Sequence, residues 1–314
     1  MASEPGLARL RAALMEYLGA ERVRTNEPLA RHTFYRIGGP ADLFISVRSI
    51  GELVKTVALA RQAKSPYFIL GAGSNILVSD SGLCGLVIEN RTKGMRLESR
   101  GSEAVVKVES GRSLGGLARE MADQGWAGLA WACGIPGTVG GGVVQNAGAH
   151  GGSMAQVLTN IDILDEQNTK RSIPASELEL DYRSSIFKKR DCRAWVILLV
   201  EINLRRGDPA ELRASIAAYN DRRRARQPAE ASCGSVFKNP PGDYAGRLIE
   251  AAGLKGQRVG GAEISPLHAN FIVNKGGATA ADVMTLIDQA RRAVCAEFDV
   301  GLELEIELIG EWQA

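Results

Sequence analysis

The first chemistry that this sequence offers is the binding of phosphate by glycine-rich backbone. Residues Pro66 to Leu70 are expected to form a strand, which leads directly into the loop Gly71 to Asn75. A strand that feeds a glycine loop is a common phosphate-binding geometry. Ile76 stands where a dinucleotide fingerprint has its third glycine, and the chain has no Gly-Lys pair for a Walker loop. By itself the loop is more typical of a tight turn than of a nucleotide site.

A second glycine-rich stretch, Gly134 to Gly151, supplies a partner for this loop. Backbone amides without bulky side chains approach a diphosphate, or the edge of an isoalloxazine ring, closely. Flexible linkers are rich in serine, whereas this stretch places Ile135, Pro136 and Val139 between its glycines. The pattern therefore predicts an ordered, buried system of turns.

A competing chemistry comes from Gly111 to Gly115, which matches the nucleophile elbow of serine hydrolases. Ser113 would then be the nucleophile, and only His150 or His268 could serve as its base. The same residues are explained more simply if Ser113 caps a helix that begins at Leu114. We expect the capping serine and keep the serine hydrolase as an alternative.

Three further segments place polar side chains beside apolar ones. Arg183 lies between aromatic residues, Ser235 follows a glycine, and Glu305 alternates with leucines in an expected half-buried strand over residues 302–309. Singly, each residue also fits a surface charge, a turn or a solvated strand face. Only in combination with the glycine loops do they indicate a site.

The composition excludes several other classes of protein. The chain has 314 residues, 45% of them hydrophobic and 24% charged, with a formal net charge of +2. This balance indicates a globular protein of two or three units, without a nucleic-acid or membrane partner. The apolar run over residues 195–200 is far shorter than a membrane span. Without a secretory pattern at the N-terminus, a cytoplasmic location is expected.

Neither a disulfide framework nor a metal centre is expected. The five cysteines are widely spaced and include no C-x-x-C pair. They are Cys84, Cys133, Cys192, Cys233 and Cys295. Three histidines without close spacing also argue against a metal site.

Capping residues and hydrophobic periodicity indicate the elements that position the loops. Ser49 with Glu52, and Thr279 with Asp282, form capping-box patterns at two helix starts, and Asp208 is a third N-cap. Three expected helices cover residues 7–18, 50–64 and 114–124, and two more begin at residues 209 and 280. The expected strands cover residues 41–47, 66–70, 105–108 and 196–200.

These elements predict an α+β protein of three units. Residues 1–65 form the first unit, residues 66–207 form a larger second unit, and residues 208–314 form the third. The last strand, which carries Glu305, is expected to return from the third unit to the site.

Taken together, the motifs resemble those of the UDP-N-acetylenolpyruvoylglucosamine reductase family. The matching segments follow the family's order along nearly the whole chain. They are residues 37–39, 71–77, 134–151, 182–188, 234–240 and 302–305. The resemblance implies the vanillyl-alcohol-oxidase (PCMH) type of FAD-binding fold, in which two α+β subdomains hold the flavin and a C-terminal α+β domain binds substrate.

The resemblance also implies that both glycine-rich stretches bind FAD non-covalently. In the first stretch the implied contacts are Leu70, Gly71, Ala72, Gly73, Ser74, Asn75, Ile76 and Leu77. In the second they are Gly134, Ile135, Pro136, Gly137, Val139, Gly140, Gly141, Asn146, Gly148 and Ala149.

The implied reaction reduces UDP-N-acetylglucosamine enolpyruvate to UDP-N-acetylmuramate in peptidoglycan synthesis, which serves cell-wall biogenesis, cell shape and cell division. NADPH reduces the flavin and leaves, and flavin N5 then passes hydride to the vinyl carbon. Ser235 resembles the family's proton donor, and Arg183 and Glu305 resemble the pair that stabilises the developing anion. Because a serine hydroxyl is a weak acid, nearby cations must assist it, and Lys238 and Arg183 are candidates.

Substrate contacts are implied for Arg226, Lys238, Asn239 and His268. Arginine suits a diphosphate because its fork donates two hydrogen bonds at once. His268 fits a turn histidine equally well, and His150 stands where the family commonly has tyrosine.

Two further expectations concern the branch of the family and the assembly. No loop is inserted between Phe187 and the strand at Ala194, as in the short-loop (type II) branch, and the aromatic residue that long-loop members close over substrate has no counterpart. We expect a monomer. A flavin-dependent oxidase of the same fold is the remaining alternative, against which Arg226 and the Ser235 segment argue.

Overall fold

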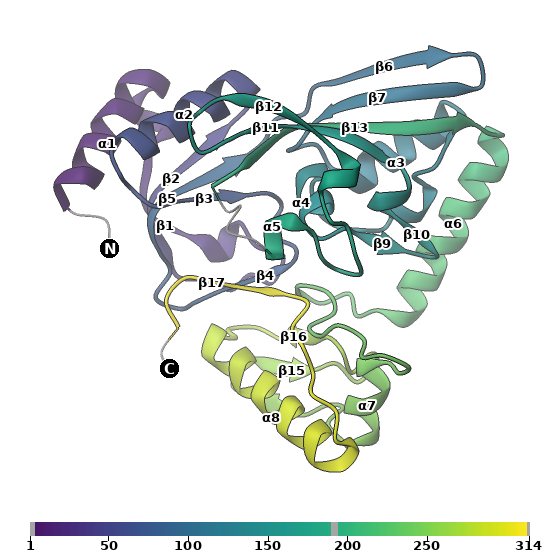
Figure 1. Cartoon of the computed structure of the whole chain (residues 1–314). Helices are drawn as coiled ribbons and strands as arrows, with labels where there is room; N and C mark the ends of the chain where they lie inside the picture. Colours follow the sequence, from purple (N-terminus) through teal and green to yellow (C-terminus); the bar gives the residue numbers. More distant parts are fainter. Residues whose placement is uncertain (1–3, 190–193, 313–314) are drawn as a thin grey trace.

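The computed structural model describes residues 4–189 and 194–312 (Figure 1). Two sheets and their helices form the upper part of the molecule in this view, and a smaller unit that contains α7 (Ala245–Ala251) and α8 (Ala280–Phe298) lies below them. Residues 190–193, which include Cys192 and part of the segment on which the short-loop comparison depends, lie outside the described residues. Among the helices that the structure describes, none is long and apolar enough to cross a membrane.

The first sheet has the strand order β1-β2-β5-β3, and two helices cover one of its faces. The predicted helix over residues 7–18 and the strand over 41–47 are confirmed. Ser49 caps the second helix as predicted, but the Glu52 carboxylate accepts from the Arg48 N–H and pairs with Arg22, so the reciprocal half of the capping box does not form. The elements are α1 (Glu4–Leu18), β1 (Arg24–Pro28), β2 (Pro40–Val47), α2 (Ile50–Gln62), β3 (Tyr67–Leu70) and β5 (Leu83–Asn90).

The second sheet is antiparallel, with the order β12-β11-β13-β7-β6, and β8 pairs with the end of β13. Its apolar face packs against α3, and α6 packs against α3 in turn. Asp208 caps α6 by accepting from the N–H groups of Ala210 and Glu211, as predicted. The elements are β6 (Met95–Arg100), β7 (Glu103–Glu109), α3 (Leu114–Asp123), β8 (Trp126–Ala127), β11 (Leu158–Leu164), β12 (Lys170–Pro174), β13 (Val196–Arg206) and α6 (Pro209–Arg226).

The second glycine-rich stretch is ordered and half-buried, but it is more than a system of turns. It contains the short helix α4 (Val139–Val144) and the two-residue strand β9 (Gly148–Ala149), which pairs with β10 (Gly152–Ser153) just after the stretch. Thr138 caps α4 by accepting from the Gly141 N–H at 3.2 Å. A Cβ at Gly140 would lie 2.9 Å from the Ser110 Cβ, so glycine allows this helix to approach the sheet.

The third unit packs two helices against a short sheet of order β14-β15-β16. The predicted capping box of Thr279 and Asp282 at the start of α8 is confirmed, and the predicted apolar stripe of that helix is fully buried. Tyr35 and Leu77 from the first part of the chain complete its core. The elements are α7 (Ala245–Ala251), β14 (Arg258–Val259), β15 (Ala262–Ile264), β16 (Ile272–Asn274) and α8 (Ala280–Phe298).

The C-terminal segment is not the continuous strand that its alternation predicts. Only β17 (Glu307–Ile309) is a strand, and it runs parallel to β4 (Ile76–Val78), whose three residues limit the pairing. The preceding residues bond to a different partner, because the Glu305 N–H donates to the Val236 carbonyl at 2.8 Å. Glu305 therefore lies where the chain changes partners, just before the strand.

These contacts lead us to propose other unit boundaries than those expected. The first sheet runs from β1 to β5, so a division after residue 65 falls inside it. Ile216 and Tyr219 of α6 pack into the core of the second sheet, so a division after residue 207 separates this helix from its partners. We propose units over residues 4–90, 91–226 and 227–312.

Asp80 joins the first and third units in a way that the sequence does not reveal. Its carboxylate accepts from the N–H groups of Ala280 and Ala281, at 2.8 and 3.0 Å, at the start of α8. Asp80→Ala should lower the free energy of unfolding by about 1 kcal/mol, because two N–H groups lose a charged acceptor. Chemical denaturation checks this value. Asp288→Ala, on the exposed side of α8, is the control and should change stability by less than about 0.5 kcal/mol.

Candidate active site

The glycine-rich stretches, the Arg183 segment and the Ser235 segment line one cavity of about 1290 Å³. Pockets for a single small ligand usually have volumes of roughly 300–1,000 Å³. This cavity therefore has room for a cofactor and a substrate side by side.

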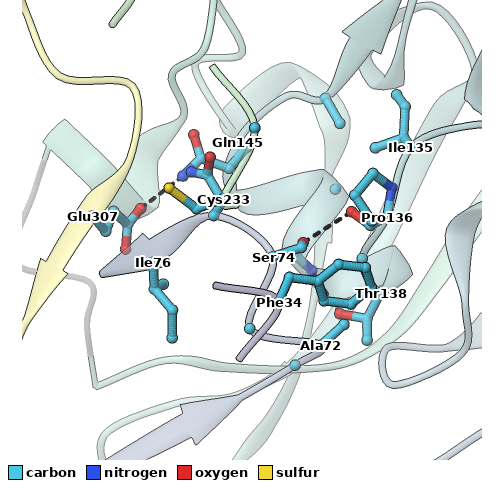
Figure 2. A pocket seen from close by; sticks show the side chains of 18 of the residues that line it. Phe34, Ala72, Ser74, Ile76, Ile135, Pro136, Thr138, Gln145, Cys233 and Glu307 are labelled. Carbon is cyan, nitrogen blue, oxygen red and sulfur yellow. Dashed lines mark hydrogen bonds between the residues drawn. The ribbon is translucent and has the colours of Figure 1, made fainter. Parts of the chain in front are cut away.

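One wall of the cavity is built from backbone and small side chains (Figure 2). The Ser74 hydroxyl donates to the Pro136 carbonyl at 2.9 Å, which ties the two glycine-rich stretches together. A Cβ at Gly71 would lie 2.7 Å from the Thr138 Oγ1, so only glycine permits this approach. Within the described part of the chain, the N–H groups of Ala72, Gly73 and Ser74 have no hydrogen-bond acceptor. Such free, adjacent amides fit the diphosphate of FAD.

Gly73 allows a test of this wall because of its backbone geometry. It has φ +63°, and an added Cβ would lie 2.4 Å from the His32 carbonyl oxygen. Gly73→Ala must therefore displace the loop, and we expect the affinity for FAD to fall at least about tenfold. Titration of apoprotein with FAD measures the effect. Gly101→Ala is the matched control, since Gly101 has φ +61° but nothing within 4 Å of its Cβ position, and its FAD affinity should stay unchanged.

Arg183 and Glu305 meet in the cavity wall. The Arg183 Nε lies 2.7 Å from the Glu305 Oε1, although its N–H direction does not satisfy the geometry of a hydrogen bond. A second guanidinium nitrogen donates to the Gly148 carbonyl at 2.9 Å. Burial raises the pKa of Glu305, and the positive charges of Arg183 and two lysines oppose this shift. The pair is a partly buried charge centre at the edge of the glycine-rich wall.

Ser235 lies on a turn that is fixed from both sides. The Asn270 side chain, 3% exposed, accepts from the Phe237 N–H at 2.9 Å and donates to the Phe237 carbonyl at 2.8 Å. On the other side, Val236 accepts from the Glu305 N–H. These contacts place the half-buried Ser235 beside the Glu305 segment in the same cavity.

Most of the predicted FAD contacts line this cavity, but three do not. Leu77 and Val139 are fully buried in hydrophobic cores, because their side chains point away from the glycine loops. Asn146 is 8% exposed and bridges two segments: it donates to the Asp181 carbonyl and accepts from the Ala155 N–H, both at 2.9 Å. Its amide thus fixes the backbone just before Arg183.

The predicted substrate contacts are divided in the same way. Arg226 and His268 line the cavity. Lys238 does not line it and pairs instead with Glu303 at 3.2 Å. Asn239 also lies outside the lining, because its side chain accepts from the Ala245 N–H at the start of α7.

Both histidines of uncertain role contribute to the cavity wall. His150 stacks on Tyr219 with ring centroids 4.1 Å apart, and burial together with Arg222 and Arg223 lowers its pKa. Burial likewise lowers the pKa of His268, whose Nδ1 accepts from the Asn270 N–H at 3.2 Å. In each ring the lowered pKa favours the neutral form.

Several lining residues were not singled out from the sequence. Thr138, Gln145 and Lys188 lie within the motifs that indicated the site, so position in a motif was an available signal. Phe34 and Arg36 also line the cavity, and no motif marked them.

Ser113 behaves as the helix cap that we expected. Its Oγ accepts from the Gly116 N–H at 3.1 Å, and the residue is exposed and outside the cavity lining. The two candidate bases, His150 and His268, line the cavity instead. The arrangement does not support a serine hydrolase.

Comparison with known proteins agrees with this geometry. Residues 41–170 match the model of an FAD-binding domain, and residues 227–309 match that of the UDP-N-acetylenolpyruvoylglucosamine reductase C-terminal domain. The chain is 46% identical to the UDP-N-acetylenolpyruvoylglucosamine reductase of Chloroflexus aggregans, over 91% of this chain and 97% of that protein. The corresponding protein of Moorella thermoacetica is also 46% identical, over 92% and 94%.

A solved structure shows the same arrangement. The crystal structure of UDP-N-acetylenolpyruvylglucosamine reductase from Thermus caldophilus superposes with a TM-score of 0.78 and 36% identity, over 92% of this chain and 99% of that one. Fold and cavity thus define an FAD-binding oxidoreductase of the vanillyl-alcohol-oxidase type. Within that class, the chain belongs to the UDP-N-acetylenolpyruvoylglucosamine reductase family.

Proposed function

We propose that the protein reduces UDP-N-acetylglucosamine enolpyruvate to UDP-N-acetylmuramate with FAD and NADPH, in the synthesis of peptidoglycan precursors. This proposal depends on one observation: Ser235 and the Arg183–Glu305 pair line the same cavity as the glycine-rich loops, and the Glu305 N–H bonds to Val236, the residue after Ser235. Membership of the reductase family supports the choice of substrate.

The glycine-rich wall would hold the cofactor. The free N–H groups of Ala72, Gly73 and Ser74 suit the FAD diphosphate, and Gly140, Gly148 and neighbouring residues leave room for the flat ring. When bound there, FAD supplies the hydride for the vinyl carbon. A cavity larger than one ligand is consistent with NADPH and substrate using the free part in turn.

The chain's own residues would handle the developing negative charge and the proton. As hydride adds to the enol ether, charge builds on the adjacent carboxylate, and the Arg183 guanidinium stabilises it. Glu305 keeps that guanidinium in place at 2.7 Å. The Ser235 hydroxyl donates the proton to the neighbouring carbon, and the positive charge of Arg183 stabilises the alkoxide that remains.

Arg226 and His268 are the proposed contacts of the rest of the substrate. Both line the cavity, and the fork of Arg226 suits the diphosphate of the nucleotide sugar. We propose that the enzyme works as a monomer. A nucleotide-activated sugar and NADPH are metabolites of the cytoplasm, which we propose as its location.

Product analysis in heavy water tests the proposal. The carbon adjacent to the former vinyl carbon should carry one deuterium from solvent. The former vinyl carbon should carry the hydrogen delivered by flavin N5, which is deuterium where the N5–H exchanges with solvent before the transfer. Mass spectrometry and NMR read both positions. Consumption of NADPH without UDP-N-acetylmuramate would instead indicate an oxidase of the same fold.

A further inference from the structure

Lys188 is a charged residue of the cavity wall, close enough to Glu305 to influence its charge, that the proposed mechanism does not use. It lies on the short helix α5 (Ile186–Lys189), five residues after Arg183, and lines the cavity. The Ser185 hydroxyl donates to the Val144 carbonyl at 2.7 Å and anchors α5 on α4. Lys188 is therefore fixed relative to the glycine-rich wall.

Two side chains from distant parts of the sequence hold its ammonium group. The Lys188 Nζ donates to the Gln145 Oε1 at 2.9 Å, and it lies 3.6 Å from the Glu307 Oε1. The Gln145 Nε2 in turn donates to the same Glu307 oxygen at 2.9 Å, and Figure 2 shows these two side chains facing each other. The carboxylate and the amide thus orient Lys188 without using all of its hydrogen bonds.

The hydrogen-bond count leaves capacity for a ligand. An ammonium group has three N–H donors, Gln145 takes one, and a separation of 3.6 Å is too long for a second hydrogen bond. Only 20% of the side chain is exposed, and burial lowers the pKa of Lys188. A partly desolvated cation with free donors gains more from an arriving anion than a solvated one does.

The neighbouring arginine has less capacity left. Glu305 is in contact with its Nε, and the Gly148 carbonyl takes a further N–H. A substrate carboxylate that gains charge during the reaction would then meet a guanidinium that is already partly neutralised. A second cation at this end of the cavity would complete the stabilisation.

On the basis of the proposed function, we infer that Lys188 is a further substrate-binding residue, which Gln145 and Glu307 position so that its ammonium group binds the carboxylate of the enolpyruvyl group. Lys188 would contact only this carboxylate of the substrate. UDP-N-acetylglucosamine lacks this carboxylate, whereas the product UDP-N-acetylmuramate carries one on its lactyl group. If Lys188 binds the carboxylate, its loss should weaken the binding of the product alone. If it only supports the shape of the site, its loss should weaken the binding of both ligands.

Lys188→Met tests the inference through binding, followed by the change in flavin absorbance on titration of the oxidised holoenzyme. We expect the affinity for UDP-N-acetylmuramate to fall about 10- to 100-fold, as for the loss of a hydrogen bond to a charged group. The affinity for UDP-N-acetylglucosamine should change less than about twofold. Lys188→Arg, which keeps the cation, should recover most of the lost affinity.

The matched control is Lys107→Met, which removes a lysine that pairs with Glu201 at 3.2 Å on the second sheet, outside the cavity lining. It should bind both ligands as the wild type does. Equal weakening of both ligands by Lys188→Met, or unchanged affinity for the product, would overturn the inference and leave Lys188 as a link between α5 and β17. If the wild-type protein bound neither ligand, the proposed function itself would fail.

Discussion

Ser235→Ala should slow the reduction of the enolpyruvyl substrate by at least about 10²-fold, while NADPH continues to reduce the flavin at the wild-type rate. The hydroxyl is the proposed source of the proton, and its removal leaves the cofactor wall intact. Asn270 and the Glu305 segment hold the turn through its backbone and not through the Ser235 side chain. Stopped-flow absorbance of the flavin measures the two half-reactions separately.

Two companion variants make this result specific. Ser235→Cys keeps a proton donor at the same position and should retain part of the lost rate. Ser113→Ala removes a serine that caps α3 outside the cavity and should leave both half-reactions unchanged. If Ser235→Ala left the substrate half-reaction intact, Ser235 would not be the donor.

Arg183→Lys should slow the same half-reaction by about 10²-fold, although the positive charge is kept. Arginine contacts Glu305 with one nitrogen and donates to the Gly148 carbonyl with another, and it can still face a substrate carboxylate. A lysine ammonium is a single point and cannot hold these positions together. Single-turnover oxidation of the reduced flavin by substrate measures the loss.

Arg112→Lys provides the comparison for that variant. Arg112 also joins a carboxylate, that of Glu120, and a backbone carbonyl, that of Lys93, but it lies outside the cavity lining. Its replacement should leave the rate of flavin oxidation unchanged. A wild-type rate in Arg183→Lys would show that geometry at this position does not matter, contrary to the proposed role.

Local patterns were sufficient to predict most elements of the fold. The capping residues Ser49, Asp208 and Thr279 each accept from the start of the helix that they predicted, because such caps depend only on neighbouring residues. The helix α4 was missed, since three consecutive glycines disfavour helix in an isolated chain. Close packing against Ser110 makes glycine necessary there.

Long-range pairing explains what the sequence could not predict. The alternation over residues 302–309 is typical of one strand, yet its first half bonds to the segment around Val236 and its second half to β4. This change of partners brings Glu305 beside Ser235 and directs Glu307 towards Gln145 and Lys188. The positions of Lys238 and Asn239 could not be predicted for the same reason. Lys238 pairs with Glu303, which the C-terminal segment brings beside it, and Asn239 accepts from the Ala245 N–H at the start of α7.

One anaerobic titration shows whether this cavity holds a flavin that carries hydride from NADPH to the enolpyruvyl substrate. The purified protein should show the absorbance bands of oxidised FAD, and NADPH should bleach them. The bands should return on addition of UDP-N-acetylglucosamine enolpyruvate and not on addition of UDP-N-acetylglucosamine. A colourless protein that does not bind added FAD would rule out a flavin in this cavity, and a bleached flavin that the substrate leaves reduced would rule out hydride transfer to the enolpyruvyl group.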